Sequence, residues 1–171
     1  MRFIITCISI LLAHAVSYAQ PGPYTRIEVV EPSLTRLLYP SLDLQDSASL
    51  YKKFGNGIHI YVPDKCYVYL DSNNYICGYI INNSSDPVIM HGCAPEISGF
   101  IEKMTNGSWV QAFPRYRRTC GVGCFDKKLP PGNYMVVLAA VPVADGQRKP
   151  ARLKLYLNNK DRVSNVYTGY F

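Results

Sequence analysis

From residue 57 to the C-terminus, short apolar runs are separated by clusters of polar turn residues. The runs are rich in β-branched and aromatic side chains, and several of them alternate apolar and polar positions, which favours strands. The predicted strands cover residues 58–62, 66–70, 75–81, 88–90, 97–104, 108–113, 134–141, 152–157 and 165–171. The first three are joined by short turns, which predicts a meander. About seven to nine short antiparallel strands predict an all-β fold, arranged as a two-sheet sandwich.

Three segments carry stronger local signals. Asn106 and Gly107 stand between two apolar runs, and this dipeptide favours a two-residue hairpin turn. Residues 134–141 are uniformly apolar, which is typical of a strand buried on both faces. Residues 152–157 alternate polar and apolar side chains, which predicts a strand with one face in water.

The N-terminal third differs from this pattern. Residues 1–19 have one cation, an apolar run and small residues at the end, which predicts a secretory signal peptide. Residues 20–24 contain two prolines and a glycine and are expected to be flexible; a single domain then covers residues 25–171, beginning with a strand at 25–31. Residues 32–56 predict a short helical or irregular insertion, with a helix at 47–54 that Gly55 ends.

The signal peptide predicts a secreted or periplasmic protein. No later segment approaches about 18 uninterrupted apolar residues, so no transmembrane segment is expected in the mature chain. Export also argues against a nucleic-acid partner.

Five cysteines follow the signal peptide: Cys66, Cys77, Cys93, Cys120 and Cys124. In an oxidising compartment they are expected to form two disulfides, which leaves one cysteine for an intermolecular bridge. Cys66 and Cys77 flank a turn and are expected to face each other across a hairpin, and Cys93 is expected to meet Cys120 or Cys124. The spacing of these residues matches no strong zinc motif, so neither a metal nor a cofactor is expected.

The charge is unevenly distributed. The chain carries 18 Lys and Arg against 12 Asp and Glu. Residues 20–99 have five cations and eight anions, whereas residues 100–171 have twelve cations and four anions. The basic half can attract an anionic partner, although mixed surface charge also serves ordinary solvation.

The densest basic cluster consists of Arg115, Tyr116, Arg117 and Arg118. Arginines interleaved with a tyrosine can bind carboxylates, phosphates or sulfated sugars by bidentate hydrogen bonds and stacking. The four residues are therefore the predicted binding site, with a solvated loop as the alternative.

Catalytic signatures are scarce. The sequence has no GxSxG, HExxH, P-loop or GxGxxG motif in a suitable context, so no enzyme is expected and no catalytic residue is assigned. His59 lies within a predicted alternating strand, and the spacing of Glu96 and Glu102 defines no carboxylate pair. The fourteen tyrosines, among them Tyr67 and Tyr69, indicate a half-buried aromatic sheet face or an aromatic binding face.

From about Tyr79 to Phe171 the chain resembles bacterial immunoglobulin-like β-sandwich domains, of the kind found in secreted proteins and proteinase-inhibitor-like modules. The resemblance rests on residues 81–88, on Ile101 and Glu102 leading into 106–109, on the turn at 129–134, and on Ser164 and Asn165 near the terminal Phe171. In that family these positions are scaffold. The resemblance therefore implies a fold rather than an activity.

Three functional hypotheses follow. The first is an exported, non-catalytic binding domain that engages a protein or an anionic glycan at the cell surface or outside the cell. The second is a secreted enzyme inhibitor or effector that acts through a disulfide-held loop, and the third is a structural envelope or matrix component. In a eukaryotic secretory pathway, Asn82, Asn83 and Asn106 stand in glycosylation sequons.

Overall fold

The computed structural model describes residues 26–38, 44, 47–70, 73–93, 96–114, 124–141 and 146–171. The expected signal peptide at 1–19 and the segment at 20–24 lie outside these residues. The described strands are β1 (Ile27–Val30), β2 (Ile58–Tyr61), β3 (Tyr67–Leu70), β4 (Asn73–Asn82), β5 (Val88–Cys93), β6 (Glu96–Ile97), β7 (Gly99–Thr105), β8 (Ser108–Gln111), β9 (Cys124–Leu129), β10 (Asn133–Val141), β11 (Arg148–Leu157), β12 (Lys160–Val163) and β13 (Tyr167–Tyr170). The helices are α2 (Pro32–Leu38) and α3 (Ser47–Lys53).

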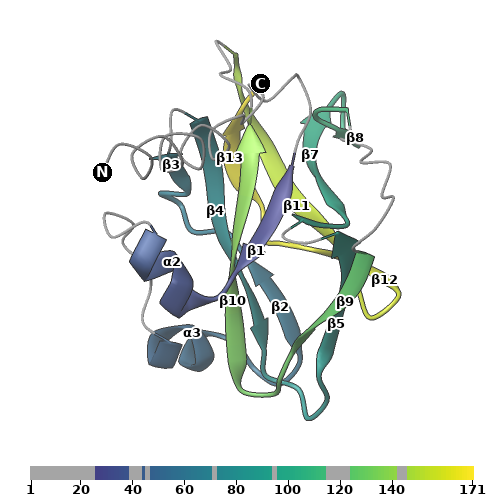
Figure 1. Cartoon of the computed structure of the whole chain (residues 1–171). Helices are drawn as coiled ribbons and strands as arrows, with labels where there is room; N and C mark the ends of the chain where they lie inside the picture. The colour runs from purple at the N-terminus through teal and green to yellow at the C-terminus, as the bar shows by residue number, and fades with distance from the viewer. Residues whose placement is uncertain are drawn as a thin grey trace, which may run out of the picture.

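The described strands form one 13-stranded sheet in which the paired strands run antiparallel (Figure 1). Its main path is β2-β4-β10-β1-β6-β5-β11-β7-β8, while β12 and β13 pair with β11, β3 with β4 and β9 with β5. The all-β prediction is therefore confirmed.

Strand β10 is the most buried element of the sheet. Every residue from Tyr134 to Val141 is buried, as the uniformly apolar run predicts. The strand pairs with β4 along its whole length and with β1 on its other edge, so both of its edges and both of its faces are covered.

Alternate residues of β10 belong to two separate apolar clusters. Val137 faces the main core, which also contains Ile60 of β2, Ile101 of β7 and Leu155 of β11. These residues come from distant positions along the strand order, so the sheet bends around this cluster. Val136 and Leu138 belong to a second core on the opposite face of the sheet.

The helical insertion covers the second core. Leu50 of α3 is fully buried there, with Tyr51 and Phe54 partly buried beside it. The side-chain amide of Asn83 donates to the carbonyl oxygens of Phe54 (2.9 Å) and Gly55 (3.2 Å), where the chain leaves α3. Two short helices within residues 32–56 match the prediction for this region.

The predicted meander of the first three strands is wrong. β2 pairs with residues 79–82 of β4, and β3 pairs with residues 73–76 of the same strand. Because β10 occupies the other edge of β4, β2 and β3 lie one after the other along a single edge. Pro63 lies between β2 and β3. Because a proline cannot donate a backbone hydrogen bond to a sheet, its position is consistent with the end of β2 before β3 begins.

The predicted hairpin at Asn106 and Gly107 is confirmed. Thr105 and Ser108 face each other at the end of the β7–β8 pair, and Asn106 and Gly107 both have positive φ angles, of 50° and 78°. These angles are those that a tight two-residue β-turn requires.

Asn82 is expected to be a major contributor to stability. Its side chain is fully buried; it donates to the carbonyl oxygens of Asp86 and Leu129 (both 2.9 Å) and accepts hydrogen bonds from the backbone and hydroxyl of Ser84. Replacing Asn82 with alanine leaves buried polar groups unpaired, so Asn82→Ala should lower the free energy of unfolding by about 3 kcal/mol.

Denaturant unfolding measures this effect. Asn133→Ala is the control, because Asn133 is exposed and makes one surface hydrogen bond to Pro131; it should change stability by less than about 0.5 kcal/mol. Equal losses for the two variants would contradict the role assigned to Asn82.

Candidate functional site

The hairpin formed by β11 and β12 places Arg162 at an opening of the main core. Asn158 and Asn159 form its two-residue turn with φ angles of 50° and 59°, a conformation that asparagine tolerates better than most residues. In this pairing Arg162 stands opposite Leu155, which is fully buried. Facing residues of paired strands point to the same side of a sheet, so the side chain of Arg162 lies on the core side.

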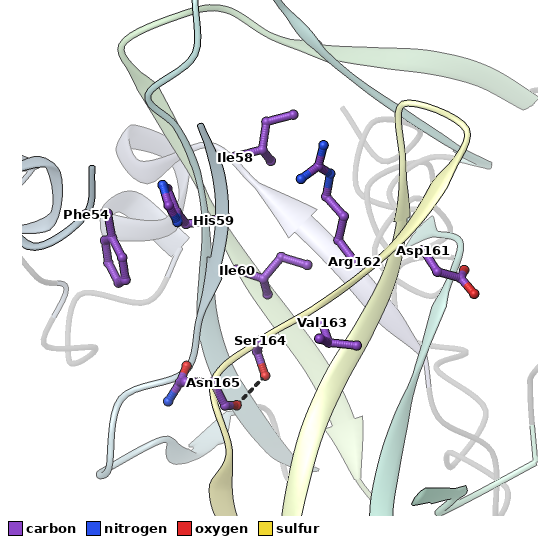
Figure 2. A pocket seen from close by; sticks show the side chains of 9 residues that line it. All are labelled: Phe54, Ile58, His59, Ile60, Asp161, Arg162, Val163, Ser164 and Asn165. Atoms are coloured by element: carbon purple, nitrogen blue, oxygen red, sulfur yellow. Dashed lines mark hydrogen bonds between the residues drawn. The ribbon is translucent and has the colours of Figure 1, made fainter. Parts of the chain in front are cut away.

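A cleft of about 460 Å³ lies between β2 and β12. Figure 2 shows the side chains of Ile58, Ile60 and Arg162 in the space between the two strands, whereas Asp161 points away from that space. Its volume falls within the range of roughly 300–1,000 Å³ that is usual for ligand pockets.

The polar groups around the cleft differ in whether they have a hydrogen-bond or ion-pair partner. Asp161 forms an ion pair with Lys154 (3.0 Å), and His59 Nε2 lies 2.9 Å from the carbonyl oxygen of Gly55 while its ring stacks on Phe54. Nε of Arg162 is buried and has no hydrogen-bond partner among the described residues. Arg162 is therefore the group in this cleft best placed to receive an acceptor from a ligand.

Asn165 closes one end of the cleft. Its Oδ1 accepts a hydrogen bond from the backbone N–H of Val62 (2.8 Å), and its Nδ2 donates to the carbonyl oxygen of the same residue (2.8 Å). One side-chain amide thus joins the chain after β2 to the connection between β12 and β13.

The sequence did not identify this site. β12 was not predicted, because its four residues, Lys-Asp-Arg-Val, are mostly charged and lack the usual strand pattern. The Asn158-Asn159 dipeptide directly after a clearly alternating strand is the signal that would have revealed the hairpin.

The expected disulfide between Cys66 and Cys77 is wrong, because both residues are free and buried. Their segments do pair, since the N–H of Cys77 donates to the carbonyl oxygen of Cys66 (2.7 Å). However, Cys66 packs in the main core and Cys77 in the second core, on opposite faces of the sheet. Burial raises the pKa of the Cys66 thiol to about 11 and that of Cys77 to about 12, so both are unreactive near neutral pH.

Cys124, by contrast, is disulfide-bonded. It begins β9 and stands opposite Cys93 in the pairing of β9 with β5. The side chain of Cys93 and the whole of Cys120 lie outside the described residues.

The predicted binding residues Arg115, Tyr116, Arg117 and Arg118 also lie outside the described residues. The strand β9, which follows them, was not predicted from the sequence. It brings Asp126 opposite His91, with Nδ1 of His91 2.5 Å from Oδ1 of Asp126. The other ring nitrogen of His91 lies 2.9 Å from Oδ1 of Asn159, so both nitrogens have partners.

Tyrosines form an aromatic cluster beneath α3. Tyr61 stacks near Tyr79, Tyr79 lies beside Tyr134, and Tyr51 of α3 meets Tyr134 edge-on, with ring centroids 6.0–6.3 Å apart. Tyr79 and Tyr134 are buried, which supports a packing role, rather than a binding role, for these two tyrosines. Tyr69 is 69% exposed and does not belong to this cluster.

The three sequons occupy different environments. Asn82 is fully buried, and the amide of Asn83 bonds to carbonyl groups at the end of α3. Asn106 is exposed at the tip of the β7–β8 hairpin. Of the three, Asn106 alone has an exposed side chain without a hydrogen-bond partner among the residues that the structure describes.

The described residues contain neither a metal-binding cluster nor a membrane-spanning helix. No group of three or more His, Cys, Asp or Glu side chains in that part of the chain is arranged to hold a metal ion. Neither of the two described helices has the length and apolar character needed to cross a bilayer.

Comparison with known proteins finds no matching family model, no similar curated protein and no similar solved structure.

The buried thiols should make the fold sensitive to alkali. A thiol whose pKa is raised in the folded state ionises first in the unfolded state, near its ordinary value of 9.0. The unfolded state then binds fewer protons, so the free energy of unfolding should decrease as the pH rises above about 9.

Denaturant unfolding at several pH values between 9 and 10 measures the slope of the free energy of unfolding against pH. This range lies below the ordinary pKa of tyrosine, so the thiols dominate the titration. The double variant Cys66→Ala/Cys77→Ala should have a shallower slope than the parent, whatever its stability at pH 7. Identical slopes would show that the two thiols do not cause the effect.

Proposed function

We propose that the chain is an exported, non-catalytic binding domain whose cleft between β2 and β12 receives an anionic group of a partner molecule. The observation that carries the proposal is the buried Nε of Arg162 without a hydrogen-bond partner among the described residues. An unpaired buried donor is costly, and a bound carboxylate or sulfate would remove that cost. The excess of cations in residues 100–171 would favour the approach of such a partner.

The fold proposed for this domain is a two-sheet, immunoglobulin-like sandwich. Its support is the main core, which gathers residues from strands far apart in the strand order, such as Ile60 of β2 and Ile101 of β7. A layer of sheet on each side of that core is the arrangement that a sandwich requires.

We further propose a disulfide between Cys93 and Cys124. The two residues face each other in the β5–β9 pair, and facing residues have Cα atoms roughly 4.5–5.5 Å apart, which suits a disulfide. Cys124 is already disulfide-bonded. This bridge would leave Cys120 as the cysteine available to another chain, and it agrees with a domain exported to an oxidising compartment.

The role of Arg162 can be tested with a small carboxylate. N-acetylglutamate added to the labelled protein should shift the NMR signals of β2 and β12 in a saturable way. Arg162→Gln should weaken this binding about tenfold, because a hydrogen bond to a charged group contributes about 1.5 kcal/mol or more.

Lys160→Gln is the matched control. It removes the same charge from the same strand, but Lys160 is exposed and does not line the cleft. Equal weakening by both substitutions would mean that net charge alone accounts for binding.

The basic cluster at residues 115–118 is proposed as a second contact for the same anionic partner. The support for this proposal is the sequence pattern alone. Replacing Arg115, Arg117 and Arg118 with alanine should lower the salt concentration that elutes the protein from a heparin matrix. The control variant replaces three exposed lysines, Lys52, Lys128 and Lys160, and so loses the same charge. If both variants elute together, the cluster has no specific role.

A further inference from the structure

Strand β2 has an edge that faces the cleft and has no strand partner in the described part of the chain. β2 pairs with β4 on one side, and the cleft lies on the other, between β2 and β12 (Figure 2). An unpaired edge presents backbone N–H and C=O groups to whatever occupies that space.

The hydrogen bonds at the start of β2 show which backbone groups point into the cleft. The N–H of Asn83 donates to the carbonyl oxygen of Gly57 (2.8 Å), so the backbone of Gly57 faces β4. In an antiparallel pair this orientation alternates along the strand, so residues 59 and 61 also face β4. The N–H and C=O groups of Ile58, Ile60 and Val62 therefore point the other way.

Asn165 already makes one pair of strand-like hydrogen bonds on this edge. Its carboxamide offers one acceptor and one donor, as a peptide unit does, and both are bonded to the backbone of Val62. The backbone groups of Ile60 and Ile58 continue the same line, and a strand would place matching groups every two residues, roughly 7 Å apart. The free edge of β2 is thus suited to forming backbone hydrogen bonds with an extended peptide.

We propose that the ligand of the cleft is an extended acidic peptide segment that pairs with the free edge of β2 and places a carboxylate on Arg162. This inference rests on the proposed function, because it names the partner of the same cleft. Ile58 and Ile60 provide apolar contacts for neighbouring side chains of the segment, and Arg162 selects an acidic residue among them. A sulfated glycan satisfies Arg162 but lacks the regular donors and acceptors that the edge of β2 requires.

The test uses an acetylated and amidated octapeptide with one central glutamate among alternating threonine and valine residues. Two N-methylated versions block opposite edges of the peptide. The version blocked on the edge that faces β2 should bind at least tenfold more weakly, while the version blocked on the other edge should bind as the parent does. Bound peptide should also slow hydrogen exchange at the amides of Ile58 and Ile60.

The contribution of the carboxylate is measured separately. Replacing the glutamate of the peptide with glutamine, or using the Arg162→Gln protein, should each weaken binding about tenfold, and the two changes together should have little more effect than one. Lys160→Gln should bind the peptide nearly as the parent protein does. These changes leave the backbone of β2 intact.

Three outcomes would overturn the inference, and they differ in what they say of the proposed function. If both N-methylated peptides bind like the parent and Arg162 is still required, anion binding stands but strand pairing is wrong. The same conclusion follows if a heparin tetrasaccharide binds in an Arg162-dependent way and the octapeptide does not. If Arg162→Gln does not weaken the binding of the peptides, of the tetrasaccharide or of N-acetylglutamate, the proposed function fails as well.

Discussion

The burial of both faces of β10 is the constraint on which the rest of the fold depends. Alternate side chains of a strand point in opposite directions, so a strand that is apolar at every position must have a layer on each side. The bent sheet supplies one layer around Val137, and α3 supplies the other through Leu50. The positions of the helices and of the distant strands follow from this requirement.

The bend that encloses the main core also brings the edges of β2 and β12 towards the same cleft. These strands do not pair with each other; one side-chain amide, that of Asn165, joins the two regions at Val62. The cleft therefore lies where the sheet does not close, and Arg162 reaches it from the core side of β12. Within the described part of the chain, strand edges without a strand partner and a buried arginine donor without a hydrogen-bond partner are features that stability alone does not favour.

Elements with strong local signals were predicted correctly, and elements defined by distant pairing were not. β10, the hairpin at Asn106 and the helix before Gly55 each follow from composition or a turn residue within a few positions. β9 and β12 are rich in charged residues and become strands because β5 and β11 offer them a partner. The cleft was missed for the same reason, since Arg162 has no distinguishing neighbours in the sequence.

The sequence by itself determined the all-β class, the fully buried strand, the tight turns and the basic character of the second half, because these depend on the identity and spacing of neighbouring residues. Tertiary structure decided which strands share an edge and which face each side chain occupies. Cys66 and Cys77 illustrate the difference: their segments meet as expected, yet their thiols enter different cores. The face that a side chain takes at a strand end depends on packing with distant residues, and no local pattern encodes it.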